Sequence, residues 1–167
     1  ARRVLLSTGL IDEVPDLEGF RALWGTSIFQ CPYCHGWEVQ DRRFAYLAAN
    51  VEGLAFAIFL RGWTQDLVVL TGGTFVIPDE QRDALGRGGV AIEERPIDRL
   101  VASGDQLAYI QFTDGTRLGR DVLFMHPPQR QVDLVRTLGV ALDDKGFVQV
   151  TEPARQTSMP GVYAAGD

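Results

Sequence analysis

Short apolar runs separated by polar or glycine-containing turns extend along the whole chain and predict alternating strands and helices. Residues 44–48 predict a buried strand, residues from about 51 to 61 a helix, and residues 66–70 a further strand. A strand, a helix and a strand in close succession form a βαβ unit, which implies parallel strands joined by a right-handed crossover. The helix is expected to bury the apolar residues that share one of its faces, which are Val51, Leu54, Ala55, Ile58 and Phe59.

The pattern changes in the second half of the chain. Ile97–Ala102 and Leu107–Thr113 predict paired strands, and the turn signal at Thr113–Thr116 leads into a third strand at Arg117 and Leu118. We expect these strands to form an antiparallel meander that crosses over the parallel sheet. The other predicted strands are Arg3–Ser7, Ser27–Gln30, Val90–Glu93, Asp121–Met125, Phe147–Val150 and Val162–Ala165. The other predicted helices are Phe20–Trp24, Pro78–Gly86 and Asp133–Leu138. The segment Ile11–Gly19 is predicted to be a connector.

Composition excludes several classes of function. The net charge of −6 leaves no basic surface for nucleic acid or for an anionic membrane. The longest apolar runs, such as Leu54–Leu60, are far shorter than the roughly 20 residues that a membrane span needs. Two cysteines in 167 residues do not form the disulfide framework of a small secreted domain, so we expect a cytoplasmic protein with no nucleic-acid or membrane partner.

Both cysteines lie in the segment Cys31–Gly36, with the spacing C-x-x-C. Two buried structural thiols would have no reason to lie at this spacing. A zinc site needs four ligands, and His35, directly after Cys34, is poorly placed to share a metal with both sulfurs. We therefore expect no metal and interpret the pair as a redox dithiol, in which one cysteine attacks and the other resolves. Pro32 suits the first turn of a helix that would begin at the pair.

One alternative uses the same four residues. Cys31–Cys34 has the sequence Cys-Pro-Tyr-Cys, which resembles the active-site tetrapeptide of glutaredoxins. A glutaredoxin-like thiol transferase would also need a cis-proline loop downstream, for which Val76–Pro78 is the available candidate. The predicted βαβ unit and the additional length fit that fold poorly.

Three longer segments resemble a different family. Thr157–Asp167 resembles the FAD-domain signature of the thioredoxin reductase family, and Arg3–Gly9 resembles its Thr-Gly segment at the exit from the FAD domain. Cys31–Gly36 resembles the redox C-x-x-C of the family's dithiol-oxidase-like branch. The resemblance implies an α/β fold, namely a Rossmann-like pyridine-nucleotide-type domain (a parallel sheet plus an antiparallel β-meander) with flanking pieces of an FAD domain. It places the FAD-domain exit at residues 1–14, the NAD(P)-type domain at 15–126 and the FAD-domain re-entry at 127–167.

The resemblance also implies roles for individual residues. Cys34 becomes the thiol nearest the flavin, and Cys31 becomes the interchange thiol that meets the substrate. His35 stands where the family usually has an acid, and its imidazole titrates near neutral pH, so it is a candidate for moving the proton that thiolate chemistry releases. FAD is the implied cofactor, and its implied ligands are Thr8, Gly9, Gly166 and Asp167. His126 is left open between a structural and a site-lining role.

One part of the sequence departs from the family. The nucleotide-binding turn G-x-G-x-x-G is replaced by Ala48–Gly53, in which only Gly53 keeps its glycine and remains as a candidate cofactor-binding residue. Glu52 would place a negative charge where the pyrophosphate of a nucleotide should lie. The second strand ends at Val69–Gly73 with neither an acid for a ribose hydroxyl nor an arginine cluster for a 2′-phosphate. We therefore expect this domain to bind NADPH weakly or not at all.

The resemblance implies part of an FAD-dependent thiol/disulfide oxidoreductase that exchanges electrons between the cysteine pair and flavin. Its substrate would be a small dithiol or disulfide, or a thioredoxin-like protein, and family members are commonly homodimers. A complete member also carries an upstream glycine fingerprint for FAD, so we expect an internal fragment that binds no FAD and has no activity when isolated. A catalytically inactive docking domain with a nucleotide-binding fold is the remaining alternative.

Overall fold

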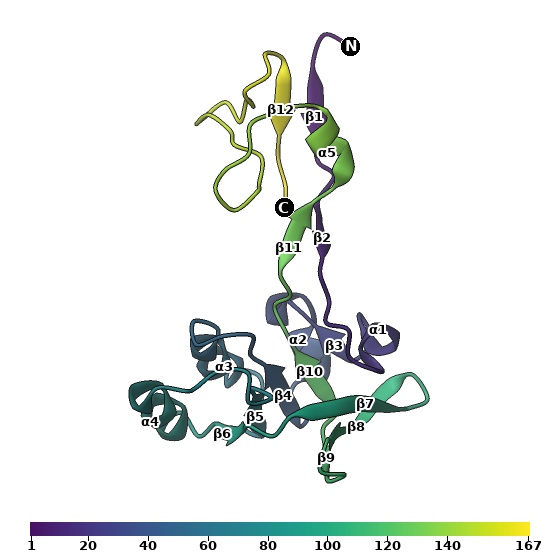
Figure 1. The fold of residues 1–167 in the computed structure, drawn as a ribbon, viewed down its shortest axis with the longest axis vertical. Coiled ribbons are helices and arrows are strands. Elements are labelled where there is room, and N and C mark those ends of the chain that lie inside the picture. The colour runs from purple at the N-terminus through teal and green to yellow at the C-terminus, as the bar shows by residue number, and fades with distance from the viewer. The chain divides into compact units, whose positions relative to one another are not determined.

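The computed structural model describes residues 1–167, the whole chain (Figure 1). The chain divides into two units. The terminal unit combines Ala1–Glu13 with Pro128–Asp167, and the central unit is Val14–Pro127. The assignment of residues 1–14, 15–126 and 127–167 to FAD-domain and NAD(P)-type segments stays a prediction. Every helix is too short or too polar to cross a bilayer.

The central unit contains a five-stranded sheet with the order β3-β10-β4-β5-β6. All neighbouring strands in it are parallel. Helix α3 connects β4 to β5, and α4 connects β5 to β6, so the predicted βαβ unit is confirmed. The strands are β3 (Ile28–Phe29), β4 (Phe44–Leu47), β5 (Leu67–Leu70), β6 (Ala91–Glu93) and β10 (Val122–Phe124), and the helices are α3 (Leu54–Leu60) and α4 (Asp79–Arg87).

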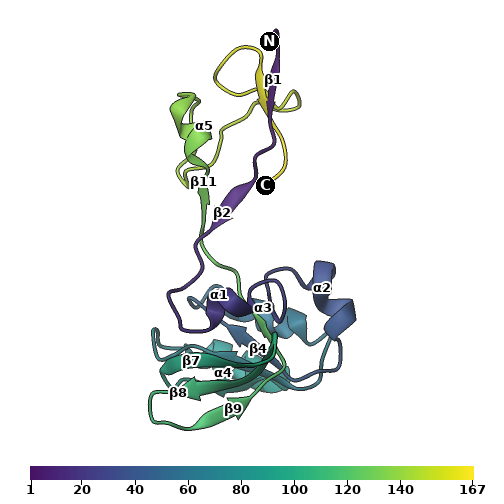
Figure 2. The ribbon, with the colours of Figure 1, turned by 90° about the vertical axis from the view of Figure 1, so that its right-hand side faces the viewer.

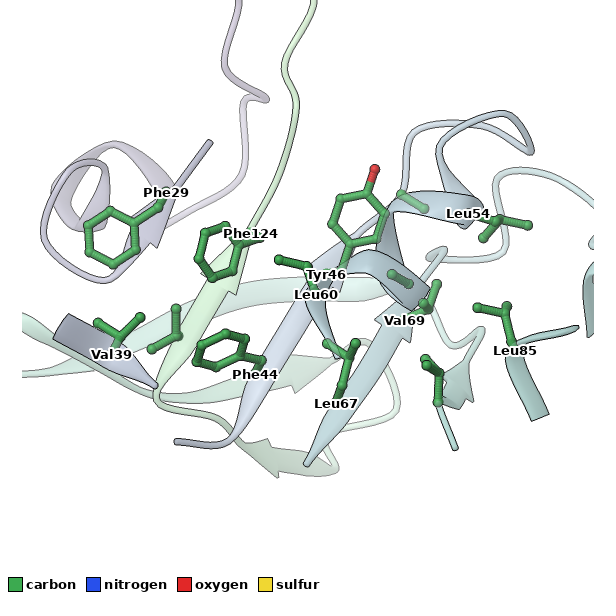
Figure 3. Packing of buried hydrophobic residues seen from close by; sticks show 14 of the residues in the cluster. Phe29, Val39, Phe44, Tyr46, Leu54, Leu60, Leu67, Val69, Leu85 and Phe124 are labelled. Carbon is green, nitrogen blue, oxygen red and sulfur yellow. The ribbon is translucent and has the colours of Figure 1, made fainter. Parts of the chain in front are cut away.

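The strands of this sheet are apolar on both faces, because successive side chains point to opposite sides of a strand. Phe44 and Tyr46 of β4 belong to one buried cluster, together with Phe124 of β10, as Figure 3 shows. Ala45, which lies between them in the sequence, belongs to a second cluster with Leu123. A continuous apolar run therefore folds here as a central strand that is covered on both sides.

The buried face of α3 differs from the predicted one. The structure buries Leu54, Ala57 and Leu60, whereas Ala55, Ile58 and Phe59 are exposed. The helix also begins at Leu54 rather than near residue 51. All seven residues from Leu54 to Leu60 are apolar, so the helical period alone does not select a face. Packing against the sheet selects it instead.

The predicted meander is confirmed as a separate three-stranded antiparallel sheet of β7 (Ile97–Ser103), β8 (Gln106–Phe112) and β9 (Arg117–Gly119) (Figure 2). Its buried residues Leu100, Ile110 and Phe112 pack in the second cluster with Ala45 and Leu123. The other face of the parallel sheet packs against residues of α3 and α4, including Leu54, Leu60 and Leu85. The parallel sheet therefore lies between the meander on one face and the helices on the other.

The terminal unit is built from two strand pairs and one helix. β1 (Val4–Leu6) pairs in parallel with β12 (Val162–Ala164), and β2 (Leu10–Asp12) pairs antiparallel with β11 (Gln129–Gln131). Helix α5 (Asp133–Thr137) follows β11. The buried apolar residues of this unit are few, and they are Leu6, Val135, Val140 and Val162.

Three predictions for the terminal unit were wrong in part. Val4 and Leu5 are 42% and 61% exposed, so β1 is not the buried strand that its apolar run predicts. Residues 10–12 form β2 at the start of the predicted connector, and its partner β11 was not predicted. Phe147–Val150 does not form a strand and has only an isolated bridge between Leu142 and Val148. Polar strands such as Gln129–Gln131 carry no apolar pattern that would reveal them.

Candidate functional site

The cysteine pair lies at the start of a helix that follows a strand of the parallel sheet. β3 ends at Phe29, Cys31 occupies the N-cap position, and α2 runs from Pro32 to Val39. Cys31 and Cys34 form a disulfide with their Cα atoms 5.3 Å apart. Because all five strands run the same way, α2 begins at the carboxyl edge of the sheet, which is where open α/β sheets place their ligands. Only the first turn of α2 had been predicted, from Pro32.

The two sulfurs have different surroundings. The Cys31 sulfur accepts a hydrogen bond from the backbone N–H of Cys34 over 3.2 Å, at the positive end of the helix dipole. When the disulfide is reduced, this position stabilises the thiolate of Cys31 relative to its thiol. Cys34 is exposed, whereas Cys31 is half-buried. The geometry therefore favours Cys31 as the thiol with the larger thiolate fraction.

The histidines lie near the same edge, and both contact aromatic rings. The His35 ring stacks on Phe29, with 4.6 Å between ring centroids and 13° between ring planes. His126, which follows β10, packs edge-on against Phe56 at 4.1 Å, and burial lowers the pKa of its imidazole below the usual value. Its neutral form therefore predominates near pH 7. The role of His35 in catalysis stays a prediction.

Aromatic side chains surround the helix that carries the cysteines. Tyr33 and Trp37 of α2 are 79% and 75% exposed. The ring of Tyr33 lies 5.4 Å from that of Phe59 and 5.5 Å from that of Trp63. Exposed aromatic clusters of this kind are unusual on a soluble surface and mark sites of contact with another molecule. No pattern in the sequence relates these rings to one another, because they form a group only when α2 and α3 are folded.

Gly36 holds α2 against Trp63. A Cβ atom at Gly36 would lie 2.5 Å from the indole atoms Cδ1 and Nε1 of Trp63, a distance at which either α2 or the indole must move. Gly36 is therefore required for the close approach of α2 to the end of α3, and this contact fixes the position of the cysteine pair.

Gly36→Ala is expected to lower the free energy of unfolding of the central unit by about 1–3 kcal/mol, because overpacking outweighs the helix propensity that alanine adds. It should also slow disulfide exchange by displacing α2. Urea unfolding followed by tryptophan fluorescence measures the first effect, since Trp24, Trp37 and Trp63 are the chain's three tryptophans and all lie in the central unit.

Gly86→Ala in α4 is the matched control for this variant. No heavy atom lies within 4 Å of a Cβ at Gly86, so alanine there should add about 0.5–1 kcal/mol of stability. Equal stabilisation by the two substitutions would contradict the packing role of Gly36.

The predicted nucleotide turn, Ala48–Gly53, lies at the carboxyl end of β4. The strand order reverses at this point, because β5 and β6 lie on one side of β4 and β10 lies on the other. The side-chain oxygen of Asn50 accepts a hydrogen bond from the backbone N–H of Gly53 over 3.0 Å. A Cβ at Gly53 would lie 2.9 Å from the hydroxyl oxygen of Tyr46. Because Gly53 has no side chain, the N-terminal end of α3 can pack closely against β4. The N–H of Gly53 is already paired within the chain. Burial raises the pKa of Tyr46 to about 12, so its hydroxyl stays protonated.

The remaining predicted cofactor residues come together in the terminal unit. A cavity of about 490 Å³ is lined by Thr8, Gly9, Gly166 and Asp167, which are far apart in the sequence. Each pair lies one residue beyond the end of a strand, since Thr8 and Gly9 come after β1, and Gly166 and Asp167 come after the parallel strand β12. The cavity therefore lies at the carboxyl ends of parallel strands. Gln131 also lines it and was not predicted, because no motif contains it.

The residues at this cavity fit a flavin dinucleotide. A Cβ atom at Gly9 or at Gly166 would meet no heavy atom within 4 Å, so both backbones have open space beside them for a ligand to approach. The carboxylate of Asp167 is exposed and accepts hydrogen bonds of the kind that ribityl hydroxyls donate. Gly53, the fifth predicted cofactor residue, belongs to the central unit instead.

Comparisons with known proteins cover nearly the whole chain. No protein-family model matches it. A thioredoxin reductase, sirT, of Leptosphaeria maculans is 30% identical over 181 residues, covering 99% of this chain and 55% of that protein. A thioredoxin reductase, tcpT, of Claviceps purpurea is 30% identical and covers 99% of this chain and 54% of that protein.

Among solved structures, the crystal structure of HlmI has a TM-score of 0.89 and 34% sequence identity, covering 99% of this chain and 52% of that one. The chain spans about half the length of the curated relatives that it matches. The similarity includes both units described above, because it extends over essentially all residues of the chain.

Proposed function

We propose, because this chain is thioredoxin reductase-like along its whole length, that it forms part of an FAD-dependent thiol/disulfide oxidoreductase. The observation that carries the proposal is the disulfide between Cys31 and Cys34 at the exposed N-terminus of α2. A disulfide in this place is accessible to an attacking thiolate, and the helix N-terminus stabilises the Cys31 thiolate that the second exchange step releases.

The exchange proceeds in two balanced steps. A thiolate of a dithiol substrate attacks the Cys31 sulfur, which forms a mixed disulfide and releases Cys34 as a thiolate. The second thiolate of the substrate then attacks the substrate sulfur that is bonded to Cys31. This step closes the substrate disulfide and releases the Cys31 thiolate, which the Cys34 N–H stabilises. The substrate loses two electrons and two protons, and the cysteine pair gains the two electrons. The same steps in reverse reduce a disulfide.

We propose that the protons pass to and from the cysteines through His35. It directly follows Cys34, and its ring is exposed while one face rests on Phe29. An imidazole nitrogen can accept a proton from a thiol and pass it on to water.

FAD, when bound, takes up the electron pair of the reduced cysteines and passes it to a further acceptor. We propose that Thr8, Gly9, Gly166 and Asp167 hold it in the cavity of the terminal unit, where the glycine backbones and the Asp167 carboxylate support this assignment. The open backbone at Gly9 and Gly166 suits the close approach of a dinucleotide.

The substrate that we propose is a small dithiol or disulfide, or a thioredoxin-like protein, with an apolar surface beside its sulfur atoms. The exposed rings of Tyr33 and Trp37 on α2, together with Phe59 of α3, support an apolar contact. Aromatic rings stack on flat or apolar groups at low entropic cost, because each side chain has only two torsions to fix. We further propose a cytoplasmic location, where a C-x-x-C pair cycles between thiols and disulfide.

The two alternatives have less support. In a glutaredoxin-like enzyme Pro78 would contact the cysteine pair, but here Pro78 occupies the N-cap of α4 in the βαβ part of the sheet. In a docking domain the cysteines would need no helix N-terminus and no exposure, and this chain has both.

The NAD(P)H site gives a separate prediction. Isothermal titration with NADPH and with NADH is expected to detect no low-micromolar binding. The Gly53 N–H already donates its hydrogen bond to the Asn50 side chain, and the Glu52 carboxylate repels a pyrophosphate. Ala48→Gly combined with Asn50→Gly restores the glycine turn and frees that N–H, so this double variant should bind either nucleotide more tightly than the unaltered chain. Low-micromolar binding by the unaltered chain would refute the prediction.

Oxygen uptake with excess dithiothreitol and FAD tests the function as a whole. The protein at its full natural length should consume oxygen only when both are present, and a visible spectrum after desalting should show retained flavin. Absence of both signals would reject the flavoenzyme assignment.

A further inference from the structure

We infer that Gln131 is a hydrogen-bonding contact for FAD in the cavity of the terminal unit, an inference that rests on the proposed function. Gln131 ends β11 and lines the cavity beside Thr8, Gly9 and Asp167. It is 6% exposed, whereas Thr8 and Asp167 are open to water. Gln131 is therefore the least exposed polar residue among those that line this cavity.

Gln131 differs from the other buried polar side chains. Ser27 accepts a hydrogen bond from the Leu107 N–H, Thr64 donates to the Arg42 carbonyl, Thr71 accepts from the Gly73 N–H, and Thr157 donates to the Val162 carbonyl. Each of these four is paired within the chain. The Gln131 side-chain amide has no hydrogen-bond partner in the chain, yet it is not one of the fully enclosed unpaired polar groups, which are Gln81 Oε1 and Arg120 Nε. The amide therefore opens into the cavity that Gln131 lines.

Its neighbour on the same strand shows the contrast. Side chains at alternate positions of a strand share a face, so Gln129 and Gln131 point to the same side of β11. Gln129 donates a hydrogen bond of 2.9 Å to Asp12, the residue opposite it on β2. The residue opposite Gln131 is Leu10, which offers no side-chain partner and also lines the cavity.

An amide that opens into a cavity and has no partner in the chain is free to pair there with water or with a ligand. An amide offers one acceptor and two donors, which match the hydroxyl, phosphate and ring-nitrogen groups of FAD. The cavity that Gln131 lines is also lined by Thr8, Gly9, Gly166 and Asp167, the proposed FAD ligands. FAD in this cavity therefore supplies the partner that the chain does not.

The test compares Gln131→Leu with Gln129→Leu, the same substitution two residues away. The protein at its full natural length is stripped of flavin, and quenching of FAD fluorescence on titration gives the Kd. Gln131→Leu should raise the Kd roughly tenfold, the effect of losing one hydrogen bond to a buried polar partner. Gln129→Leu should leave the Kd unchanged.

Thermal unfolding of the flavin-free protein distinguishes a ligand contact from a structural role. Gln131→Leu should leave the unfolding temperature unchanged or raise it, since it removes an unpaired amide, whereas Gln129→Leu should lower it by removing the bond to Asp12. Gln131→Ala serves as a second variant with the same expected Kd if leucine does not fit.

The outcomes separate the two claims. If the unaltered protein binds FAD and both Gln131 variants keep its Kd, the Gln131 contact is overturned while the proposed function stands. If the unaltered protein binds no FAD, both are overturned. A Gln131→Leu variant with an unchanged Kd and a lower unfolding temperature would assign Gln131 a structural role instead.

Discussion

Cys31→Ser is expected to lower the rate of thiol/disulfide exchange by on the order of 10³-fold or more, because removing a covalent nucleophile removes the whole reaction path. The serine hydroxyl neither forms a disulfide nor ionises near pH 7. Dithiol oxidation by the protein at its full natural length, with FAD present, measures the loss. Tyr33→Phe is the matched control, since it keeps both sulfurs and the ring that packs on Phe59 and Trp63.

Cys34→Ser is expected to be equally inactive in turnover but to behave differently towards substrate. Cys31 keeps its place at the helix N-terminus in this variant, so it still forms a mixed disulfide with an oxidised substrate, and no second cysteine remains to resolve it. Mass spectrometry should therefore detect a substrate adduct on Cys34→Ser that dithiothreitol removes. The Cys31→Ser variant should carry little adduct.

Two results would contradict these roles. Exchange at the normal rate in Cys31→Ser would place the chemistry outside the cysteine pair. A stable adduct on Cys31→Ser and none on Cys34→Ser would reverse the two cysteines, and the hydrogen bond from the Cys34 N–H would then have no part in selecting the attacking thiol.

The parallel sheet was predictable because its strands are continuous apolar runs with β-branched or aromatic residues. Phe44–Leu47 and Leu67–Leu70 contain no polar residue, and a strand buried on both faces needs none. The meander was predictable from its turn, where Asp114 accepts hydrogen bonds from Thr116 and Gly115 has a positive φ of 81°. In both cases the local signal and the packing of the whole unit agree.

Other features depend on contacts between distant residues. The buried face of α3 follows from the sheet beneath it, since every residue of the helix is apolar. The Gly36–Trp63 contact joins α2 to the turn after α3, and no sequence motif relates these two positions. Gln131 stands out only because its side-chain amide has no hydrogen-bond partner in the chain, and this depends on which residues surround it in the fold. The cysteine pair was found from spacing alone, but the difference between its two sulfurs follows from the observed start of α2.

The largest effect on stability is expected from Phe124→Ala, which should lower the free energy of unfolding of the central unit by about 3–5 kcal/mol. Phe124 is fully buried on β10, between β3 and β4, and its ring lies 5.2 Å from that of Phe44 and 6.0 Å from that of Phe29 (Figure 3). Removing it leaves a cavity between these rings that the sheet cannot close without moving a strand.

Urea unfolding followed by tryptophan fluorescence measures this loss in the central unit alone. Phe59→Ala is the matched control, because Phe59 is 40% exposed and should cost only about 1 kcal/mol through its aromatic contacts. Since Phe29 supports both Phe124 and the His35 ring, the cavity should also loosen the strand that leads into Cys31. Disulfide exchange should therefore slow in Phe124→Ala even where the unit remains folded. An exchange rate equal to that of the unaltered protein, in a variant destabilised as expected, would show that the cysteine pair is positioned by α2 and Trp63 without help from β3.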